Sequence, residues 1–124
     1  MLVGVSHLQM EEASDNIKQV GVEDKINVII GDAVDILPTL NNKYDIVFID
    51  AAKGKYPFFL EQAIWMINKN GIIIADNVLY KGYVLFDYII HKLLTAVRNL
   101  REFIYNITKT PNIQTDIFEV GDWF

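Results

Sequence analysis

The sequence contains no cysteine, so disulfide bonds and thiolate metal sites are both excluded. No apolar run reaches the roughly 18 residues of a membrane-spanning helix. The opening "MLVGVSHLQM" has neither the basic start nor the long apolar stretch of a signal peptide. Internal repeats, low-complexity tracts and linker-like segments are missing as well. We therefore expect one cytoplasmic domain without a membrane segment.

The composition is that of a globular protein with a small acidic excess. Of 124 residues, 52% are hydrophobic and 22% are charged, and this length is usual for a single domain. The net charge of −5 argues against general adhesion to nucleic acids or anionic membranes. A local basic face stays open, because Lys92, Arg98, Arg101 and Lys109 form a mildly basic stretch in and just after the helix predicted at 85–107.

Strand and helix patterns alternate along the chain. Apolar or alternating runs predict strands at residues 1–5, 26–30, 44–49, 72–75 and 113–120. Helices are predicted at residues 7–20, 33–40, 57–67 and 85–107. Ser6 and Gln9 form a capping box before the first helix, and Asn70-Gly71 is typical of a turn. Trp65 is expected in the core.

Three of the predicted strands are apolar at consecutive positions, which is typical of parallel strands covered by helices on both faces. With the alternation of strands and helices, this pattern predicts an α/β fold with a mostly parallel sheet. Ligands of such sheets bind beyond the carboxyl ends of the strands. Asp32, Asp50, Asp76 and Asn77 all fall at such ends.

Two strand ends carry oxygen ligands and one carries a lysine. "VFID" ends in Asp50, and "IIIADN" ends in Asp76 and Asn77. Two carboxylates brought close together repel unless they share a cation or a proton, and hard oxygen donors suit magnesium or calcium. Lys53 would lie at the same edge, where it could serve as a base or orient a nucleophile. Taken singly, each Asp could instead be a cap or turn former, and Lys53 a solvated surface residue.

Longer segments resemble a known family. "FIDAAKGKY", "IIIADNVLYKG" and the upstream "VIIGDAVDILPTL" are similar to the cation-dependent O-methyltransferases of the catechol and caffeoyl-coenzyme-A type, above all their small bacterial members. The similarity covers about residues 13–122. It implies a Rossmann-like three-layer sandwich, with residues 1–124 as a partial class I methyltransferase domain.

The resemblance also implies roles for individual residues. Asp50, Asp76 and Asn77 would bind a divalent cation such as Mg²⁺, Ca²⁺ or Mn²⁺. Lys53 would be catalytic together with Asp50, and Asp50 would also lie near the amino-acid end of S-adenosylmethionine. The adenine of this cofactor would contact Asp32 and Ala33. The implied reaction is methyl transfer to a hydroxyl of a catechol-like molecule or of a hydroxylated tRNA uridine, by an enzyme that forms a homodimer when complete.

The chain also departs from the family. The family's first strand and glycine-rich loop have no counterpart, and Gly4 aligns with an acidic residue that binds the ribose. The family's last strand, which lies between the strands matching 72–75 and 113–119, is missing too. We therefore expect open strand edges and weak or no binding of S-adenosylmethionine by the chain alone.

Two other functions compete with methyl transfer. A phosphoacceptor receiver domain also uses Asp, magnesium and Lys, but it needs an acidic pair after its first strand and a Lys-Pro after its last strand. Neither feature is present. The second alternative is a non-catalytic remnant of a methyltransferase that binds a partner through its open edges.

Overall fold

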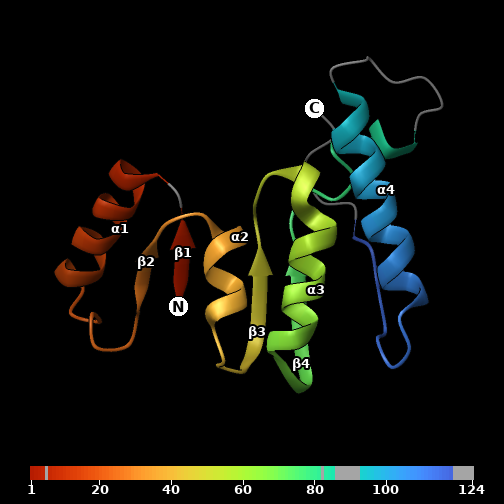
Figure 1. The fold of residues 1–124 in the computed structure, drawn as a ribbon. Coiled ribbons are helices and arrows are strands. Elements are labelled where there is room, and N and C mark those ends of the chain that lie inside the picture. The colour runs from red at the N-terminus through yellow and green to blue at the C-terminus, as the bar shows by residue number, and fades with distance from the viewer. Residues whose placement is uncertain (5, 82, 86–92, 119–124) are drawn as a thin grey trace. The chain divides into compact units, whose positions relative to one another are not determined.

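The computed structural model describes residues 1–4, 6–81, 83–85 and 93–118 (Figure 1). The chain divides into two compact units, Met1–Asn41 and Asn42–Phe124. Each unit holds a two-stranded sheet, and the strands of each sheet are parallel. The predicted parallel α/β arrangement is confirmed, although the described strands form two sheets rather than one.

Unit 1 contains a parallel strand pair and the helix that connects its strands. Its elements in chain order are β1 Leu2–Gly4, α1 His7–Gln19, β2 Val28–Ile30, α2 Ala33–Ile36 and a 3-10 helix Leu37–Thr39. Ser6 is the N-cap of α1 as predicted, because its side chain accepts a hydrogen bond from the Gln9 N–H at 3.5 Å. The chain leaves α1 through Gly21, whose positive φ of 70° suits glycine.

Gly4 is in close contact with the buried side chain of unit 1. Met10 on α1 is 6% exposed. A Cβ atom added to Gly4 would lie 2.5 Å from the Met10 Sδ. This distance is too short for nonbonded carbon and sulfur atoms, so the Met10 side chain would have to move. The absence of a side chain at Gly4 therefore lets Met10 pack against β1.

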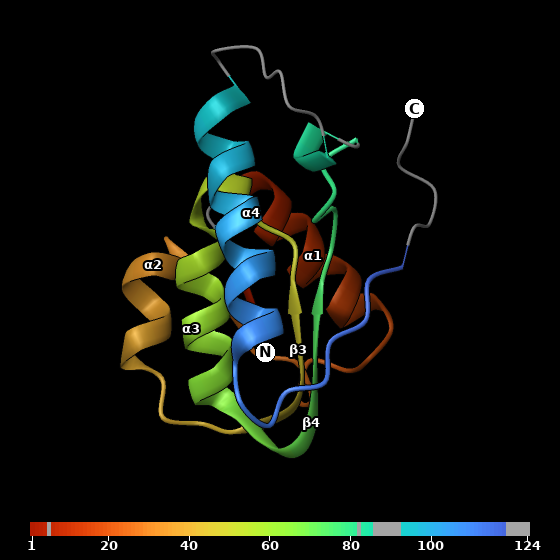
Figure 2. The ribbon, with the colours of Figure 1, turned by 90° about the vertical axis from the view of Figure 1, so that its right-hand side faces the viewer.

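Unit 2 contains the second strand pair and two helices that lie next to each other (Figure 2). Its elements in chain order are β3 Tyr44–Ile49, a 3-10 helix Lys53–Lys55, α3 Tyr56–Met66, β4 Ile67–Ala75, a 3-10 helix Tyr83–Leu85 and α4 Leu94–Lys109. Pro57 lies in the first turn of α3 as predicted. The longest connection between these elements contains residues outside the described part of the chain.

The turn predicted at Asn70-Gly71 lies within the bounds of β4, at a break in its pairing with β3. Tyr44 pairs with Ile67 and Ile46 pairs with Ile72, so β4 holds extra residues between these two pairs. Asn70 takes a positive φ of 65° there. Asn70-Gly71 therefore forms an irregularity within β4 and does not separate α3 from β4.

Two further predictions differ from the structure at the C-terminal side. The helix predicted at 85–107 is α4 Leu94–Lys109, with Leu85 in a 3-10 helix and residues 86–92 outside the described part. The strand predicted at 113–120 is not formed over 113–118, and residues 119–120 are not described. Alternation alone did not produce a strand here, because no strand pairs with residues 113–118 in the described chain.

The core of unit 2 is formed mainly by α3 and α4. Tyr56, Val97 and Leu100 are 0% exposed. Among the described residues of this unit, the other buried side chains are Ile49, Phe59, Leu60, Ala63, Met66, Val84 and Phe103. The prediction that Trp65 is buried is wrong, because its side chain is 71% exposed. Apolar spacing placed α3 correctly, but it did not identify which residues face the sheet.

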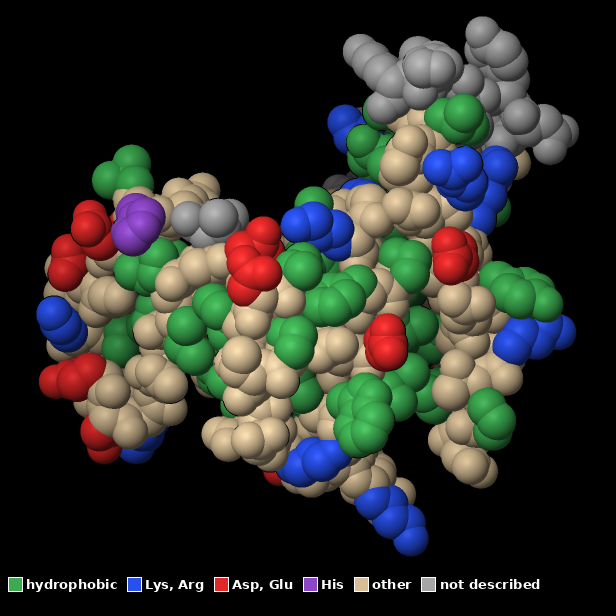
Figure 3. Space-filling view, viewed as in Figure 1, with side chains coloured by type: hydrophobic (Ala, Val, Ile, Leu, Met, Phe, Trp, Pro, Cys, Tyr) green, Lys and Arg blue, Asp and Glu red, His purple; other side chains and the backbone are tan. Residues whose placement is uncertain are grey.

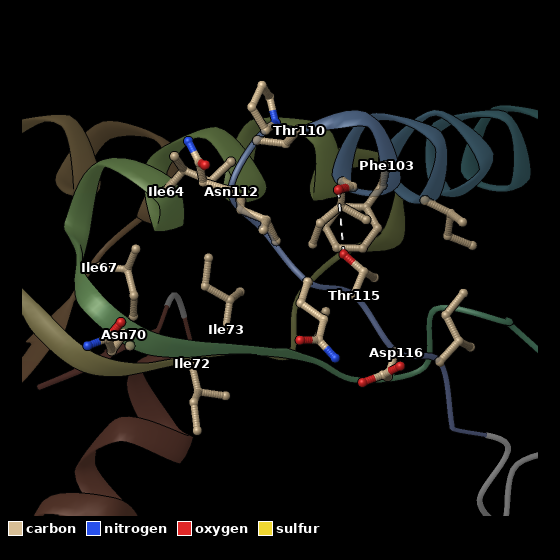
Figure 4. A pocket seen from close by; sticks show the side chains of 18 of the residues that line it. Ile64, Ile67, Asn70, Ile72, Ile73, Phe103, Thr110, Asn112, Thr115 and Asp116 are labelled. Carbon is tan, nitrogen blue, oxygen red and sulfur yellow. Dashed lines mark hydrogen bonds between the residues drawn. The ribbon is translucent and has the colours of Figure 1, made fainter.

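One face of the β3–β4 sheet is open. Ile46, Phe48, Ile72 and Ile74 are 45–61% exposed, and their register pairs Ile46 with Ile72 and Phe48 with Ile74. Figure 4 shows Ile73 pointing to the side of α4 and Ile72 pointing away from it. Cover on both faces was predicted from the consecutive apolar residues, whereas α3 and α4 leave this face exposed.

A pocket of about 990 Å³ lies between β4, the end of α4 and the segment 110–117 (Figure 4). Residues 113–117 form its far wall, opposite Ile73 and Ala75 of β4. The hydroxyl of Thr115 donates a hydrogen bond to the Ile107 carbonyl at 3.5 Å. In the described chain, residues of β4 and of the segment 113–117 thus line one pocket and do not pair as strands. Among the described helices, none is long and apolar enough to cross a membrane.

Candidate active site

Asp50 and Asp76 occupy neighbouring positions at the carboxyl ends of β3 and β4. The preceding residues, Ile49 and Ala75, are register partners. The Asp76 N–H donates a hydrogen bond to the Ile49 carbonyl at 3.0 Å, which continues the pairing past the end of β4. Because adjacent strands lie about 4.8 Å apart, the two backbones place Asp50 and Asp76 side by side at this edge of the sheet. Both residues are exposed.

Asn77 follows Asp76 and has a backbone conformation that few residue types adopt easily. Its φ of 58° lies in the left-handed region, where Asn is tolerated better than most residues other than glycine. The Tyr80 N–H donates to the Asn77 carbonyl at 3.1 Å and closes a turn. Asn77 is therefore suited to this position as a turn residue.

Lys53 lies at the same edge as Asp76. Its ammonium group donates to the Asp76 carbonyl at 3.2 Å and to the Tyr56 hydroxyl at 2.9 Å. The side chain is half-buried, and Nζ lies 4.8 Å from the centre of the Tyr56 ring. The sequence prediction that Lys53 lies at this strand edge agrees with its position. The alternative, a freely solvated surface lysine, does not agree with these contacts.

Tyr56 is the residue of this region that sequence reasoning missed. It is fully buried, and its hydroxyl lies 2.5 Å from the Asp76 carbonyl and 3.4 Å from the Ile49 carbonyl. Its ring contacts that of Phe103 on α4, with 5.4 Å between centroids. The available signal was its spacing, since Tyr56 follows Lys53 by three residues and begins α3.

Side chains of α4 support the loops next to these strand ends. Asn99 donates to the Gly54 carbonyl at 2.6 Å, within the 3-10 helix that carries Lys53. The Arg101 side chain donates to the Val84 carbonyl at 2.9 Å. These contacts link α4 to loops close to Lys53 in sequence and to the segment that follows Asn77.

The two residues predicted to bind adenine lie in unit 1. Asp32 is the N-cap of α2, and its Oδ1 accepts a hydrogen bond from the Val34 N–H at 2.9 Å. Ala33 is the first residue of α2 and is half-buried. The local structure thus agrees with the capping role that the sequence left open for Asp32, and this role does not exclude contact with a ligand.

The chemical type of the candidate ligands indicates which cation this region could bind. In the part of the chain that the structure describes, no group of three or more His, Cys, Asp or Glu side chains is placed to bind a metal. The candidate ligands are instead two carboxylates and one amide oxygen, from Asp50, Asp76 and Asn77. Such a set fits a hard cation that retains several water ligands, as Mg²⁺ does.

Comparisons with known proteins agree on one enzyme family. The sequence profile of the family described as O-methyltransferase matches residues 3–124. Catechol O-methyltransferase of Mycobacterium tuberculosis is 38% identical over 78 residues, which are 62% of this chain and 36% of that protein. Caffeoyl-CoA O-methyltransferase of Populus kitakamiensis is 33% identical over 114 residues, which are 86% of this chain and 48% of that protein.

Solved structures have the same fold. The O-methyltransferase TomG from Streptomyces achromogenes, involved in tomaymycin synthesis and solved in complex with SAM, superposes with a TM-score of 0.80 at 25% identity. The superposition covers 89% of this chain and 50% of that one. The chain thus spans about half the length of this structure, and 36% and 48% of the two curated relatives.

Proposed function

Because the chain belongs to the O-methyltransferase family of the catechol and caffeoyl-CoA type, we propose that Asp50, Lys53, Asp76 and Asn77 form the part of a methyl-transfer site that binds the acceptor. The reaction moves a methyl group from S-adenosylmethionine to a hydroxyl oxygen. The observation that carries this proposal is the pairing of Ile49 with Ala75, which brings Asp50 and Asp76 to adjacent strand ends.

A divalent cation is proposed to bind at Asp50, Asp76 and Asn77. Bound there, it would supply Lewis-acid stabilisation of the deprotonated form of the acceptor hydroxyl. The chain's own contribution is a fixed donor set. The Asp76 backbone is held by the Ile49 carbonyl, and Asn77 is held in its turn by the Tyr80 N–H. Without a cation the two carboxylates would repel each other.

Lys53 is proposed to receive or direct the proton of the acceptor hydroxyl. An ammonium group has three N–H donors, and the contacts to Tyr56 and Asp76 use two of them. The remaining position can face an acceptor oxygen. In the proposed step the O–H bond of the acceptor breaks, and its proton passes to the neutral amine of Lys53 or to water. The oxygen then attacks the methyl carbon, and the carbon–sulfur electron pair returns to sulfur.

The proposed methyl donor is S-adenosylmethionine. Asp32 and Ala33 would contact the adenine, and Asp50 would lie near the amino-acid end of S-adenosylmethionine. S-adenosylmethionine, when bound, supplies a methyl group on a positively charged sulfur. Holding both reactants in line could supply up to about 7–11 kcal/mol of the rate acceleration.

The proposed acceptor is a catechol-like small molecule, with a hydroxylated tRNA uridine as the alternative. The described part of α4 carries Arg98, Arg101 and Lys109 against one acid, Glu102. Figure 3 shows positive, negative and hydrophobic side chains together in this region of the surface. A uniformly basic face, which nucleic-acid binding favours, is not visible in this view, so the small molecule is preferred.

The first experiment measures the cation site directly. Mn²⁺ binding to the chain is followed by electron paramagnetic resonance, and Asp50→Asn and Asp76→Asn are each expected to weaken it at least about tenfold. Asp45→Asn is the matched control, because Asp45 lies near the other end of β3 and its carboxylate accepts a hydrogen bond from Asn68 at 2.9 Å. Equal binding by all variants would contradict the site.

The second experiment measures the reaction. Transfer of a labelled methyl group from S-adenosylmethionine to a catechol is compared with transfer to an unmodified tRNA and to one carrying the hydroxylated uridine. Label in the catechol alone supports the preferred acceptor. Label that appears only in the modified tRNA would replace it with the alternative.

A second candidate function is partner binding without catalysis. The open face formed by Ile46, Phe48, Ile72 and Ile74 favours it, because exposed apolar patches commonly mark interaction surfaces. This candidate predicts association measured by light scattering and no methyl transfer by the 124-residue chain. Methyl transfer by the monomeric chain would exclude it.

A further inference from the structure

Tyr56 joins the two strand ends at which the candidate cation ligands begin. Its hydroxyl approaches the Asp76 carbonyl at 2.5 Å and the Ile49 carbonyl at 3.4 Å, while it accepts the Lys53 ammonium at 2.9 Å. A hydroxyl has one hydrogen to donate, so the short contact to Asp76 is the principal bond. These contacts lie at the ends of both β3 and β4.

The surroundings of Tyr56 hold this hydroxyl in place. The side chain is 0% exposed, and its ring packs against Phe103 of α4 at 5.4 Å between centroids. Pro57, directly after it, lies in the first turn of α3. A buried hydroxyl that bonds to strand-end carbonyls is worth more than an exposed one, because water does not compete for its partners.

We propose that Tyr56 is a positioning residue of the methyl-transfer site, an inference that rests on the function proposed above. By bonding to the Asp76 carbonyl it holds the end of β4 against the end of β3, next to Asp50 and Asp76. The same hydroxyl fixes the Lys53 ammonium beside Asp76. Cation ligands and lysine therefore keep their relative positions before any ligand arrives.

The arrangement explains why a tyrosine rather than a phenylalanine stands here. The ring accounts for the packing against Phe103 and for the 4.8 Å approach of the Lys53 ammonium. Only the hydroxyl accounts for the contacts to Asp76 and Ile49. Tyr56→Phe removes the positioning contacts and keeps the ring, so it separates the two contributions.

The test compares Tyr56→Phe with Tyr105→Phe in the full chain. Tyr105 lies on α4 with 63% of its side chain exposed, so losing its hydroxyl should change nothing. Mn²⁺ affinity is measured by electron paramagnetic resonance, and hydrogen exchange is measured at the Asp76 amide, which donates to the Ile49 carbonyl. For Tyr56→Phe we expect about five- to tenfold weaker Mn²⁺ binding and about tenfold faster exchange at Asp76.

The outcomes separate positioning from general stability. A positioning role accelerates exchange at Asp76 while the amide of Ile73, within β4, exchanges as in the wild type. Equal acceleration at both amides, or no change at Asp76, would overturn the proposal. If the wild type itself does not bind Mn²⁺, the proposed cation site fails, and the exchange at Asp76 still decides whether Tyr56 holds the strand ends together.

Discussion

Replacing Asn77 with glycine separates the two roles that its position permits. Its φ of 58° costs an ordinary L residue about 1–2 kcal/mol, whereas glycine adopts it freely. We therefore expect Asn77→Gly to unfold in urea at the wild-type midpoint or slightly above it. Asn77→Ala, which lacks both the flexible backbone and the polar side chain, should lose about 1 kcal/mol of unfolding free energy.

The cation affinity should follow a different order. Both variants lose the amide oxygen proposed as a ligand, so both should bind Mn²⁺ at least about tenfold more weakly than the wild type. Stability and affinity are measured on the same samples, by urea denaturation and by electron paramagnetic resonance. If Asn77→Gly binds Mn²⁺ as tightly as the wild type, Asn77 is a turn residue only and the proposed donor set is wrong.

Three further predictions test other parts of the chain. Lys53→Ala in a version with methyl-transfer activity should lower kcat about 10²–10⁴-fold at unchanged cofactor affinity; a loss confined to that affinity would contradict the role. Leu100→Ala, at a side chain with 0% exposure, should cost about 2–5 kcal/mol of unfolding free energy. Leu94→Ala, at 46% exposure, is its control and should differ much less from the wild type. Phe48→Lys, at 60% exposure, should change stability by less than about 0.5 kcal/mol and reduce self-association in light scattering, and a large destabilisation would show that Phe48 is covered in solution.

The parts of the site that sequence predicted are those that depend on local pattern. Asp50, Asp76 and Asn77 each end an apolar run, and the carboxyl ends of paired parallel strands lie at one edge. Lys53 follows Asp50 at a short spacing, so its place at that edge also follows from local geometry. Its bonds to Tyr56 and to the Asp76 carbonyl could not be predicted, because they depend on how α3 packs on the strands.

The parts of the fold that sequence did not predict depend on partners far along the chain. Asn70-Gly71 has the composition of a turn, yet it lies between Ile67 and Ile72, which both pair with β3 and so extend β4 to either side of it. Residues 113–118 alternate like a strand, but a strand forms only beside another one. Trp65 matches a helical apolar stripe, and its exposure reflects which side of α3 faces the sheet. The local propensity of a segment cannot predict any of these strand pairings or packing contacts.

The close fit of Gly4 to Met10 predicts epistasis between these two positions. The family resemblance implies an acidic residue at position 4, but the Cβ of such a residue would lie 2.5 Å from the Met10 Sδ. Gly4→Asp alone should therefore disturb the packing of unit 1, and Met10→Ala alone should leave a cavity there. Together the two changes should be less harmful than the sum of their separate effects. A mutational path that places an acidic residue at position 4 would then change position 10 first.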